Sequence, residues 1–186
     1  MNLPNKLTTF RIILIPVFIL NLEFNLFPGS LFGTKIQMII AAIIFAVASL
    51  TDFLDGQIAR KYQLVTNFGK FADPLADKLL VITALIYLTS FDIVPAWMTA
   101  VIVIRELAIT GLRTLIVENN GKVLAAQMPG KIKTFSQMFA ILFLYANNFG
   151  TGIPFGQTLL WIAVIFTIYS GIDYFWQNRE VFSDGL

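Results

Sequence analysis

The sequence predicts an all-α integral membrane protein with six transmembrane helices and both termini in the cytoplasm. Of its 186 residues, 57% are hydrophobic and only 13% are charged, and the mean hydropathy is +0.77. So few charged residues could not cover an apolar core that faced water. The apolar residues form six runs near the length of about 20 residues that a membrane-spanning helix needs. These runs are continuous rather than alternating, which disfavours a closed β-barrel.

The six predicted spans follow one another along the chain. They lie at about 8–27, 34–58, 75–91, 95–117, 131–147 and 155–177. No shift in composition divides the chain, so residues 1–186 are expected to form a single domain. The first run has the basic start of a signal peptide but lacks a small-x-small cleavage site. We therefore expect it to remain as the first membrane helix.

Basic residues are concentrated on one side of the predicted membrane. Six spans place both termini on one side, and the opposite connections near 28–34, 91–95 and 148–154 contain no lysine or arginine, with only Lys35 beside them. The other side carries Lys6, Arg11, Arg60, Lys61, Lys70, Lys122, Lys131, Lys133 and Arg179. The positive-inside rule makes that side cytoplasmic. The chain is thus expected to be a multi-pass protein of the cell membrane.

The residue types restrict the available chemistry. The chain has no cysteine, which excludes disulfides and thiolate metal sites, and no histidine, the commonest general base. Any acid–base or metal chemistry must therefore use carboxylates. No run rich in lysine or arginine suggests a nucleic-acid partner.

Four aspartates are clustered in a chain that has only eleven acidic residues. They are Asp52, Asp55, Asp73 and Asp77. Counted along the second helix, Asp52 lies about 27 Å from the outer end, near the cytoplasmic edge of the membrane core. The third helix is expected to begin near Asp73–Asp77, with Pro74 in its first turn. Each pair, spaced i,i+3 or i,i+4, shares a helix face.

If these two faces meet, the four carboxylates converge, and a divalent cation would offset their repulsion. Oxygen ligands suit Mg²⁺, Mn²⁺ or Ca²⁺. The alternative is that they are ordinary interfacial carboxylates, solvated or paired with Arg60, Lys70 and Lys78. Gly56 would let a bulky group approach the backbone, and Arg60 offers a fork for phosphate. Together these features favour a phosphoryl-bearing substrate held by metal ions.

The spacing of these residues resembles the signature of the CDP-alcohol phosphatidyltransferases. That signature reads Asp-x-x-Asp-Gly-x-x-Ala-Arg, then eight residues, then Gly-x-x-x-Asp-x-x-x-Asp. Its fixed positions are all present, as Asp52, Asp55, Gly56, Ala59, Arg60, Gly69, Asp73 and Asp77. The six-helix architecture also agrees, so the resemblance covers essentially the whole chain. It implies that an acceptor alcohol attacks the lipid-bearing phosphorus of a CDP-linked lipid, that CMP leaves, and that the protein is a homodimer.

The resemblance also implies roles for the aspartates. Asp52, Asp55 and Asp73 would be ligands of Mg²⁺ or Mn²⁺, and Asp77 would be the general base and also touch metal. An alcohol is a poor nucleophile, and without histidine a carboxylate is the natural proton acceptor.

Two groups of residues are candidates for binding the CDP-linked lipid. The first group comes from the signature and also includes Gly69. Gly56 and Ala59 would leave room for the cytidine, and Arg60 would hold phosphate. The second is Asn5, Thr8 and Arg11, which are spaced i,i+3,i+6 on one face of the first helix. The alternative for this second group is helix capping by Asn5 or Thr8 and lipid-headgroup contact by Arg11.

A phosphorylated acceptor would need a second cationic pocket, for which the candidates are Arg105, Arg113, Lys131 and Lys133. Arg105 lies near the bilayer midplane, where a charge usually faces a cavity or a partner. The alternative role for Arg105 is an internal ion pair. Its partner would come from another helix, because the adjacent Glu106 is expected to point elsewhere. For the two lysines the alternative is contact with lipid headgroups.

The acceptor itself is indicated by weaker similarities. The segments "LPNKLTTFRIILIPVF", "GKFADPLADKLLV", "IRELAITGLR" and "GKIKT" resemble bacterial family members that join glycerol 3-phosphate to CDP-diacylglycerol, giving phosphatidylglycerophosphate. The alternatives are a family member with phosphatidylglycerol, inositol phosphate or serine as acceptor and, more remotely, a divalent-cation transporter. Transport sites tend to lie near the midplane, whereas these aspartates cluster at one interface.

Overall fold

Six α-helices form the described part of the chain. The computed structural model describes residues 2–31, 33–61, 66–118 and 128–179. The helices are α1 (Leu3–Phe24), α2 (Ile36–Lys61), α3 (Asn67–Ser90), α4 (Ala96–Glu118), α5 (Met128–Tyr145) and α6 (Phe155–Gln177). This confirms the predicted all-α class and the number of long helices.

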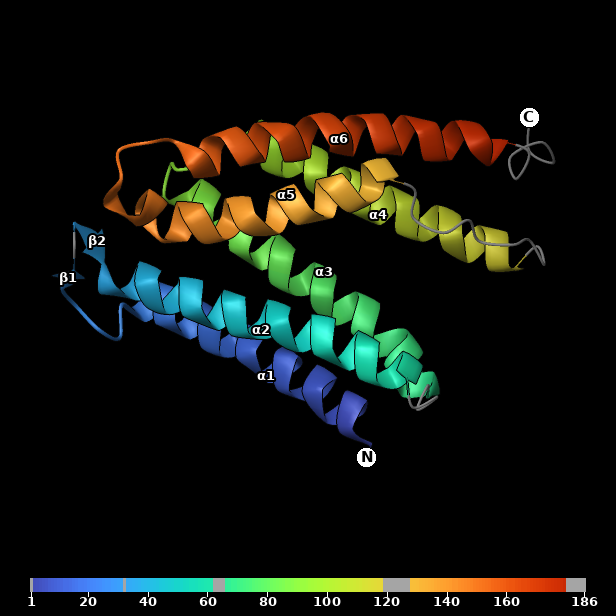
Figure 1. Cartoon of the computed structure of the whole chain (residues 1–186), viewed down its shortest axis with the longest axis horizontal. Helices are drawn as coiled ribbons and strands as arrows, with labels where there is room; N and C mark the ends of the chain where they lie inside the picture. The colour runs from blue at the N-terminus through green and yellow to red at the C-terminus, as the bar shows by residue number, and fades with distance from the viewer. Residues whose placement is uncertain (1, 32, 62–65, 119–127, 180–186) are drawn as a thin grey trace.

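Short irregular elements connect the helices at one end of the bundle. An antiparallel hairpin of β1 (Ser30–Leu31) and β2 (Thr34–Lys35) joins α1 to α2, and the 3-10 helix η1 (Asn147–Gly150) precedes α6. The sequence did not predict the hairpin, whose strands have two residues each. Figure 1 shows these connections on the left, while α1 begins and α6 ends on the right.

The helices pack in two groups that meet through the middle of the molecule. Helix α1 packs on α2 and α3, and α6 packs on α4 and α5, while α2 also contacts α5 and α3 also contacts α4 (Figure 1). Where α6 crosses α5, a Cβ at Gly156 would lie 2.8 Å from the Leu144 side chain. A small residue there allows the two backbones to approach closely.

The apolar core joins α1, α3 and α5 toward the end that holds the hairpin. Phe18 and Tyr145 are fully buried, and their rings meet edge to face with centroids 5.5 Å apart. The Tyr145 hydroxyl donates to the Ala84 carbonyl oxygen at 2.8 Å, so the buried polar group is satisfied. The opposite end of the bundle is where polar residues gather.

Two of the described helices, α1 and α6, are long and apolar enough to cross a membrane by length and composition, and α2 contains a shorter apolar stretch, Ile36–Asp52. The other predicted spans carry charged residues, among them Asp77 in α3, Arg105 in α4 and Lys133 in α5. These charges lower the mean hydropathy of their helices.

Candidate active site

The N-terminal helix holds three polar side chains against α2 and α3. Asn5, Thr8 and Arg11 lie on one buried face of α1, as their spacing predicted. The Arg11 guanidinium, with an exposed fraction of 0%, forms an ion pair with the Asp52 carboxylate at 2.7 Å. The Thr8 hydroxyl donates to the Asp73 carboxylate and also to the Pro4 carbonyl. Residues one turn apart on α1 thus contact carboxylates on two other helices.

These contacts argue against the two alternatives for the N-terminal helix, which were capping by Asn5 or Thr8 and lipid-headgroup contact by Arg11. Neither Asn5 nor Thr8 is the N-cap of α1, because that position is Asn2. A fully buried Arg11 does not contact lipid headgroups. Asp52, for its part, pairs with an arginine 41 positions earlier in the chain, a partner that its sequence neighbourhood did not predict.

The start of α3 differs from the prediction. The helix begins at Asn67, and Thr66 is its N-cap, whose hydroxyl accepts a hydrogen bond from the Gly69 amide at 3.0 Å. Asp73 therefore lies in the second turn and Pro74 inside the helix, not in its first turn. The expected start was wrong because it was judged from the apolar run, whereas the capped helix extends beyond that run.

Gly69 lies where α1 and α3 approach each other. Thr66 donates through its hydroxyl to the Asn5 side-chain oxygen at 2.9 Å. A Cβ at Gly69 would lie 3.3 Å from the Asn5 and Thr66 side-chain oxygens and 3.4 Å from an Asp73 carboxylate oxygen. A larger residue would push these groups apart, so Gly69 permits the packing around Asp73.

The structure brings part of the predicted aspartate cluster together. The carboxylates of Asp52 and Asp73 lie close enough for their charges to repel, and the charge of Asp52 also acts on Asp77. Gly56 lies half-buried in α2. The side chains of Asp55, Ala59 and Arg60 lie outside the described residues. Within the described part, no group of three or more acidic residues is gathered tightly enough to hold a metal ion. Convergence of all four aspartates therefore stays a prediction.

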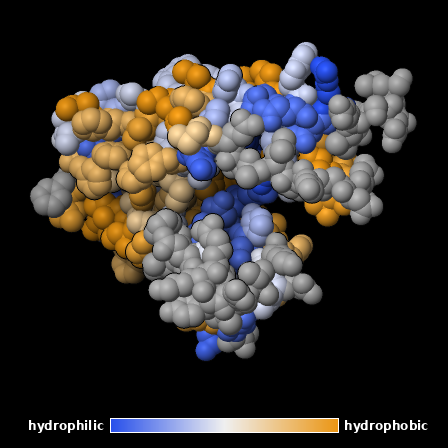
Figure 2. Space-filling view, turned by 45° about the vertical axis from the view of Figure 1, so that its right-hand side comes forward, coloured by the Kyte–Doolittle hydropathy of each residue, from blue (hydrophilic) through white to orange (hydrophobic). Residues whose placement is uncertain are grey.

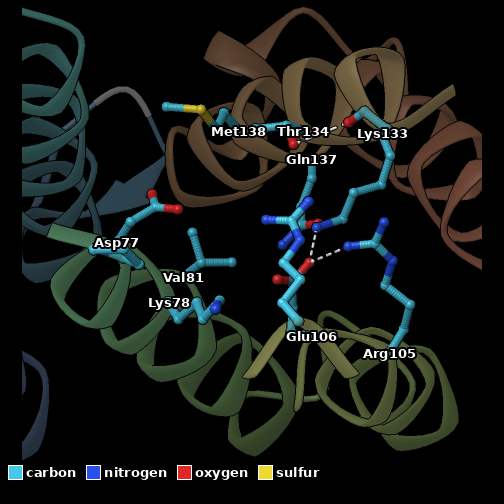
Figure 3. A pocket seen from close by; sticks show the side chains of 12 residues that line it. Asp77, Lys78, Val81, Arg105, Glu106, Lys133, Thr134, Gln137 and Met138 are labelled. Carbon is cyan, nitrogen blue, oxygen red and sulfur yellow. Dashed lines mark hydrogen bonds and ion pairs between the residues drawn. The ribbon is translucent and has the colours of Figure 1, made fainter. Parts of the chain in front are cut away.

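A cavity of about 240 Å³ opens between α3, α4 and α5 at the polar end of the bundle. Figure 2 shows hydrophilic surface recessed in a hollow at this end, and Figure 3 shows the cavity from close by. Asp77 lines it from α3, Arg105 and Arg113 from α4, and Lys133 from α5. Three of the four predicted acceptor-binding cations thus share a cavity with the predicted general base.

Lys131 is exposed and does not line this cavity. Residues two apart on a helix point to nearly opposite sides, so only one of Lys131 and Lys133 can face it. Lys133 has an exposed fraction of 5%, which argues against contact with lipid headgroups.

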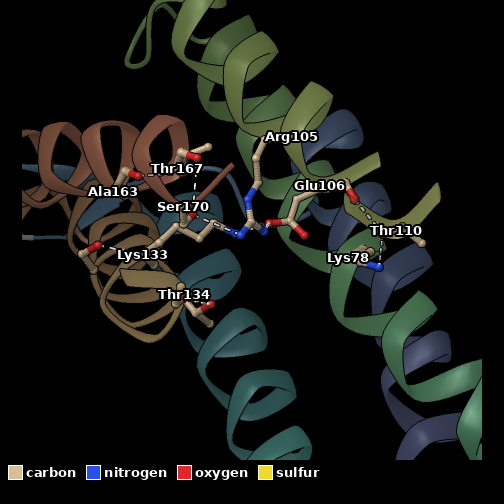
Figure 4. A network of polar contacts seen from close by, with 11 residues as sticks. Lys78, Arg105, Glu106, Thr110, Lys133, Thr134, Ala163, Thr167 and Ser170 are labelled. Atoms are coloured by element: carbon tan, nitrogen blue, oxygen red, sulfur yellow. Dashed lines mark hydrogen bonds and ion pairs between the residues drawn. The ribbon is translucent and has the colours of Figure 1, made fainter. Parts of the chain in front are cut away.

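Glu106 neutralises two of the cations. Its carboxylate pairs with Lys133 and, at 3.2 Å, with Arg105, while Arg105 also donates to the Ser170 hydroxyl of α6 at 3.1 Å (Figure 4). The expectation that Glu106 points away from Arg105 was wrong. Both side chains are long enough to bend toward the same cavity although their Cβ atoms diverge. Arg105 therefore has an internal ion pair, but its partner comes from its own helix.

Sequence reasoning missed several residues that line the cavity or support it. Lys78 donates to the Thr110 hydroxyl, and the Arg113 guanidinium lies over the Tyr174 ring, 5.5 Å from its centroid. Gln137 lines the cavity one turn after Lys133. For Glu106, the signal was an acidic residue inside a predicted membrane span, which is rare unless it has a partner.

Residues 1–169 match the family described as CDP-alcohol phosphatidyltransferase, and the chain belongs to that family. This confirms the resemblance based on the eight-residue signature. Among curated relatives, the chain is 49% identical over 186 residues to the CDP-diacylglycerol–glycerol-3-phosphate 3-phosphatidyltransferase of Bacillus subtilis, covering 96% of each chain. A protein of the same name from Rickettsia felis is 40% identical, covering 97% of each. A probable phosphatidylglycerophosphate synthase of Mycobacterium tuberculosis is 38% identical, covering 93% of this chain and 79% of the relative.

Proposed function

We propose that this chain transfers the phosphatidyl group of CDP-diacylglycerol to glycerol 3-phosphate, releasing CMP and phosphatidylglycerophosphate. The observation that carries the proposal is the cavity in which Asp77 lies with Arg105, Arg113 and Lys133. Glu106 and Lys78 line the same cavity, so its basic side chains still outnumber its carboxylates, four to two. This excess of positive charge beside Asp77 suits an acceptor that has both a reacting hydroxyl and a phosphate. The names of the curated relatives support the same donor and acceptor.

Asp77 is the proton acceptor in this proposal. As the acceptor hydroxyl oxygen bonds to the phosphorus that carries the diacylglycerol, its proton passes to the Asp77 carboxylate, and the bond to the CMP oxygen breaks. Arg105, Arg113 and Lys133 hold the acceptor phosphate, which fixes the hydroxyl near Asp77 and lowers the entropy cost of the encounter. Lys131, which lies on the opposite face of α5, is left out of this pocket.

The residue types of the predicted metal ligands suit a divalent cation such as Mg²⁺ or Mn²⁺. Asp52 and Asp73 offer carboxylate oxygens, the donors that these ions prefer, from neighbouring helices. Their charges repel each other, and Arg11 pairs with Asp52. We propose that Asp55 and Asp77 complete the set. The bound ion would offset negative charge on the pyrophosphate and on the departing CMP.

The contacts of α1 indicate a supporting role in the donor site. Arg11 and Thr8 hold the carboxylates of Asp52 and Asp73, and Asn5 holds the Thr66 cap of α3. We propose that these three residues shape the donor site by fixing the aspartates. The nucleotide itself would lie against the signature residues Gly56, Ala59, Arg60 and Gly69.

We further propose that all six helices span the membrane, with the cavity at the cytoplasmic side. The five helices of 22 to 26 residues are about 33–39 Å long, enough for a hydrocarbon core of about 30 Å, and α5, with 18 residues, is about 27 Å long, close to that thickness. Large apolar side chains are exposed on every helix, for example Ile13, Ile43, Ile86, Ile104 and Ile165, which is unusual for a surface in water. The excess of basic residues supports a cytoplasmic position for the polar end. We also propose that the protein forms the homodimer that the family implies. A measurement of the mass of the detergent-solubilised protein tests this proposal.

Acceptor competition tests the proposed reaction. Purified protein receives CDP-diacylglycerol and Mg²⁺, and then glycerol 3-phosphate, inositol phosphate, serine or phosphatidylglycerol in separate reactions, and CMP release is measured. Release with glycerol 3-phosphate alone, lost when the metal is chelated, is expected. Release with another acceptor would keep the family chemistry and overturn the substrate assignment. Metal-dependent CMP release without cation flux through vesicles would exclude the transporter.

A further inference from the structure

Gln137 is a buried polar residue that lines the cavity. It lies in α5, has an exposed fraction of 3%, and lines the cavity with Asp77 and Lys133. Its side-chain oxygen has no hydrogen-bond partner among the described residues. In Figure 3 the side chain points from α5 toward the space between α3 and α4.

Two neighbouring polar residues of α5, Ser136 and Lys133, differ in this respect. Ser136, the adjacent residue, donates its hydroxyl to the carbonyl oxygens of Ile132 and Lys133. Lys133 is paired with Glu106. Leaving a buried amide oxygen without a partner costs free energy, and such a group in a folded protein calls for an explanation. A ligand in the cavity would supply the missing partner.

We propose that the Gln137 carboxamide hydrogen-bonds the C2 hydroxyl of glycerol 3-phosphate and so determines acceptor specificity. This inference rests on the proposed function. Glycerol 3-phosphate has a phosphate, a reacting C1 hydroxyl and a neutral C2 hydroxyl between them. The cations suit the phosphate and Asp77 suits the reacting hydroxyl, while a neutral amide suits the hydroxyl that remains. Both the amide and the hydroxyl can donate and accept, so either orientation of the amide satisfies the pair.

The test compares two acceptors that differ only at C2. Glycerol 3-phosphate is set against 3-hydroxypropyl phosphate, which keeps the phosphate and the reacting hydroxyl but lacks the C2 hydroxyl. We expect the wild-type kcat/KM for CMP release to favour glycerol 3-phosphate by roughly 100-fold, because the analogue leaves a buried amide unpaired. In Gln137→Met, which keeps the side-chain length but removes the hydrogen bond, this preference should fall at least about tenfold.

The other end of the bundle offers a matched control. Gln37 in α2 is also buried, with an exposed fraction of 6%, and its side-chain oxygen also lacks a partner among the described residues. It lines a different cavity, beside the hairpin. Gln37→Met should therefore leave the preference between the two acceptors unchanged, whatever it does to stability.

The outcomes separate this inference from the proposed function. If folded wild-type protein releases no CMP with glycerol 3-phosphate, the proposed function fails and the inference fails with it. If glycerol 3-phosphate reacts but Gln137→Met slows both acceptors equally, the residue is structural and the inference alone is overturned. Equal use of both acceptors by the wild-type protein would overturn it without any variant, even if Gln137→Met does not fold.

Discussion

The ion pair between Glu106 and Lys133 allows a sharp test of how charge is balanced in the cavity. Glu106→Gln keeps the shape of the side chain but leaves Lys133, which is 5% exposed, without its carboxylate partner. Breaking a buried pair by removing one member costs about 3–5 kcal/mol, because the remaining charge stays desolvated and uncompensated. Arg105 loses a partner as well but keeps its hydrogen bond to Ser170.

A second substitution isolates the pairwise contribution. Lys133→Met in the Glu106→Gln background removes the stranded ammonium, so the double variant should be more stable than Glu106→Gln alone. The bond between Arg105 and Ser170 is expected to persist in all variants and so to cancel in the cycle. For two residues in direct contact, we expect a coupling free energy of about 1–3 kcal/mol.

The assay is equilibrium unfolding of the wild type, Glu106→Gln, Lys133→Met and the double variant in one detergent, followed by tryptophan fluorescence. Glu23→Gln serves as the control, because Glu23 is exposed and accepts a hydrogen bond from the Tyr87 hydroxyl that an amide oxygen can also accept. It should change the free energy of unfolding by less than about 0.5 kcal/mol. If Glu106→Gln costs no more than this control, or if the two cavity substitutions are simply additive, the assigned charge balance is wrong.

Three further substitutions test other parts of the structure. Gly156→Ala should cost about 1–3 kcal/mol of unfolding free energy, because its Cβ would lie 2.8 Å from the Leu144 side chain, whereas Gly111→Ala, which meets nothing within 4 Å, should be neutral or stabilising; similar losses would contradict the packing. Asp77→Asn should lower kcat about 10²–10⁴-fold while CDP-diacylglycerol still binds, and near-normal turnover would remove Asp77 as the base. Arg113→Ala should raise KM about tenfold or more for glycerol 3-phosphate but not for CDP-diacylglycerol, and equal increases would refute the acceptor pocket.

The existence of the six helices could be predicted because a run of apolar residues is a property of neighbouring positions in the sequence. The sixth helix was predicted at about 155–177 and is observed at Phe155–Gln177. The third was predicted to begin near Asp73 and begins at Asn67 instead. Hydropathy reports where a helix is apolar, whereas Thr66 decides where it begins.

The candidate site could be predicted only as sets of residues that share a helix face. The spacing of Asn5, Thr8 and Arg11 correctly predicted a common face on α1. It could not predict that Arg11 meets Asp52, because contact between helices depends on how they rotate and cross. The same applies to Gln137, whose place in the cavity depends on the packing of α5 against α3 and α4.

Two pairs of residues near the acceptor pocket show how far helix geometry can be used. Lys131 and Lys133 are two positions apart, so the helical period alone indicates that only one can enter a cavity with Arg105. The spacing of the two lysines in the sequence is therefore enough to indicate that they do not both bind the acceptor in this cavity. The same rule misled for Arg105 and Glu106, since it describes Cβ directions and not the reach of the charged groups. Adjacent charges of opposite sign gain more from meeting in a polar cavity than from separate desolvation, so their side chains bend toward each other. The direction of a Cβ therefore decides where short side chains such as Thr8 lie, while electrostatics decides the position of long charged ones.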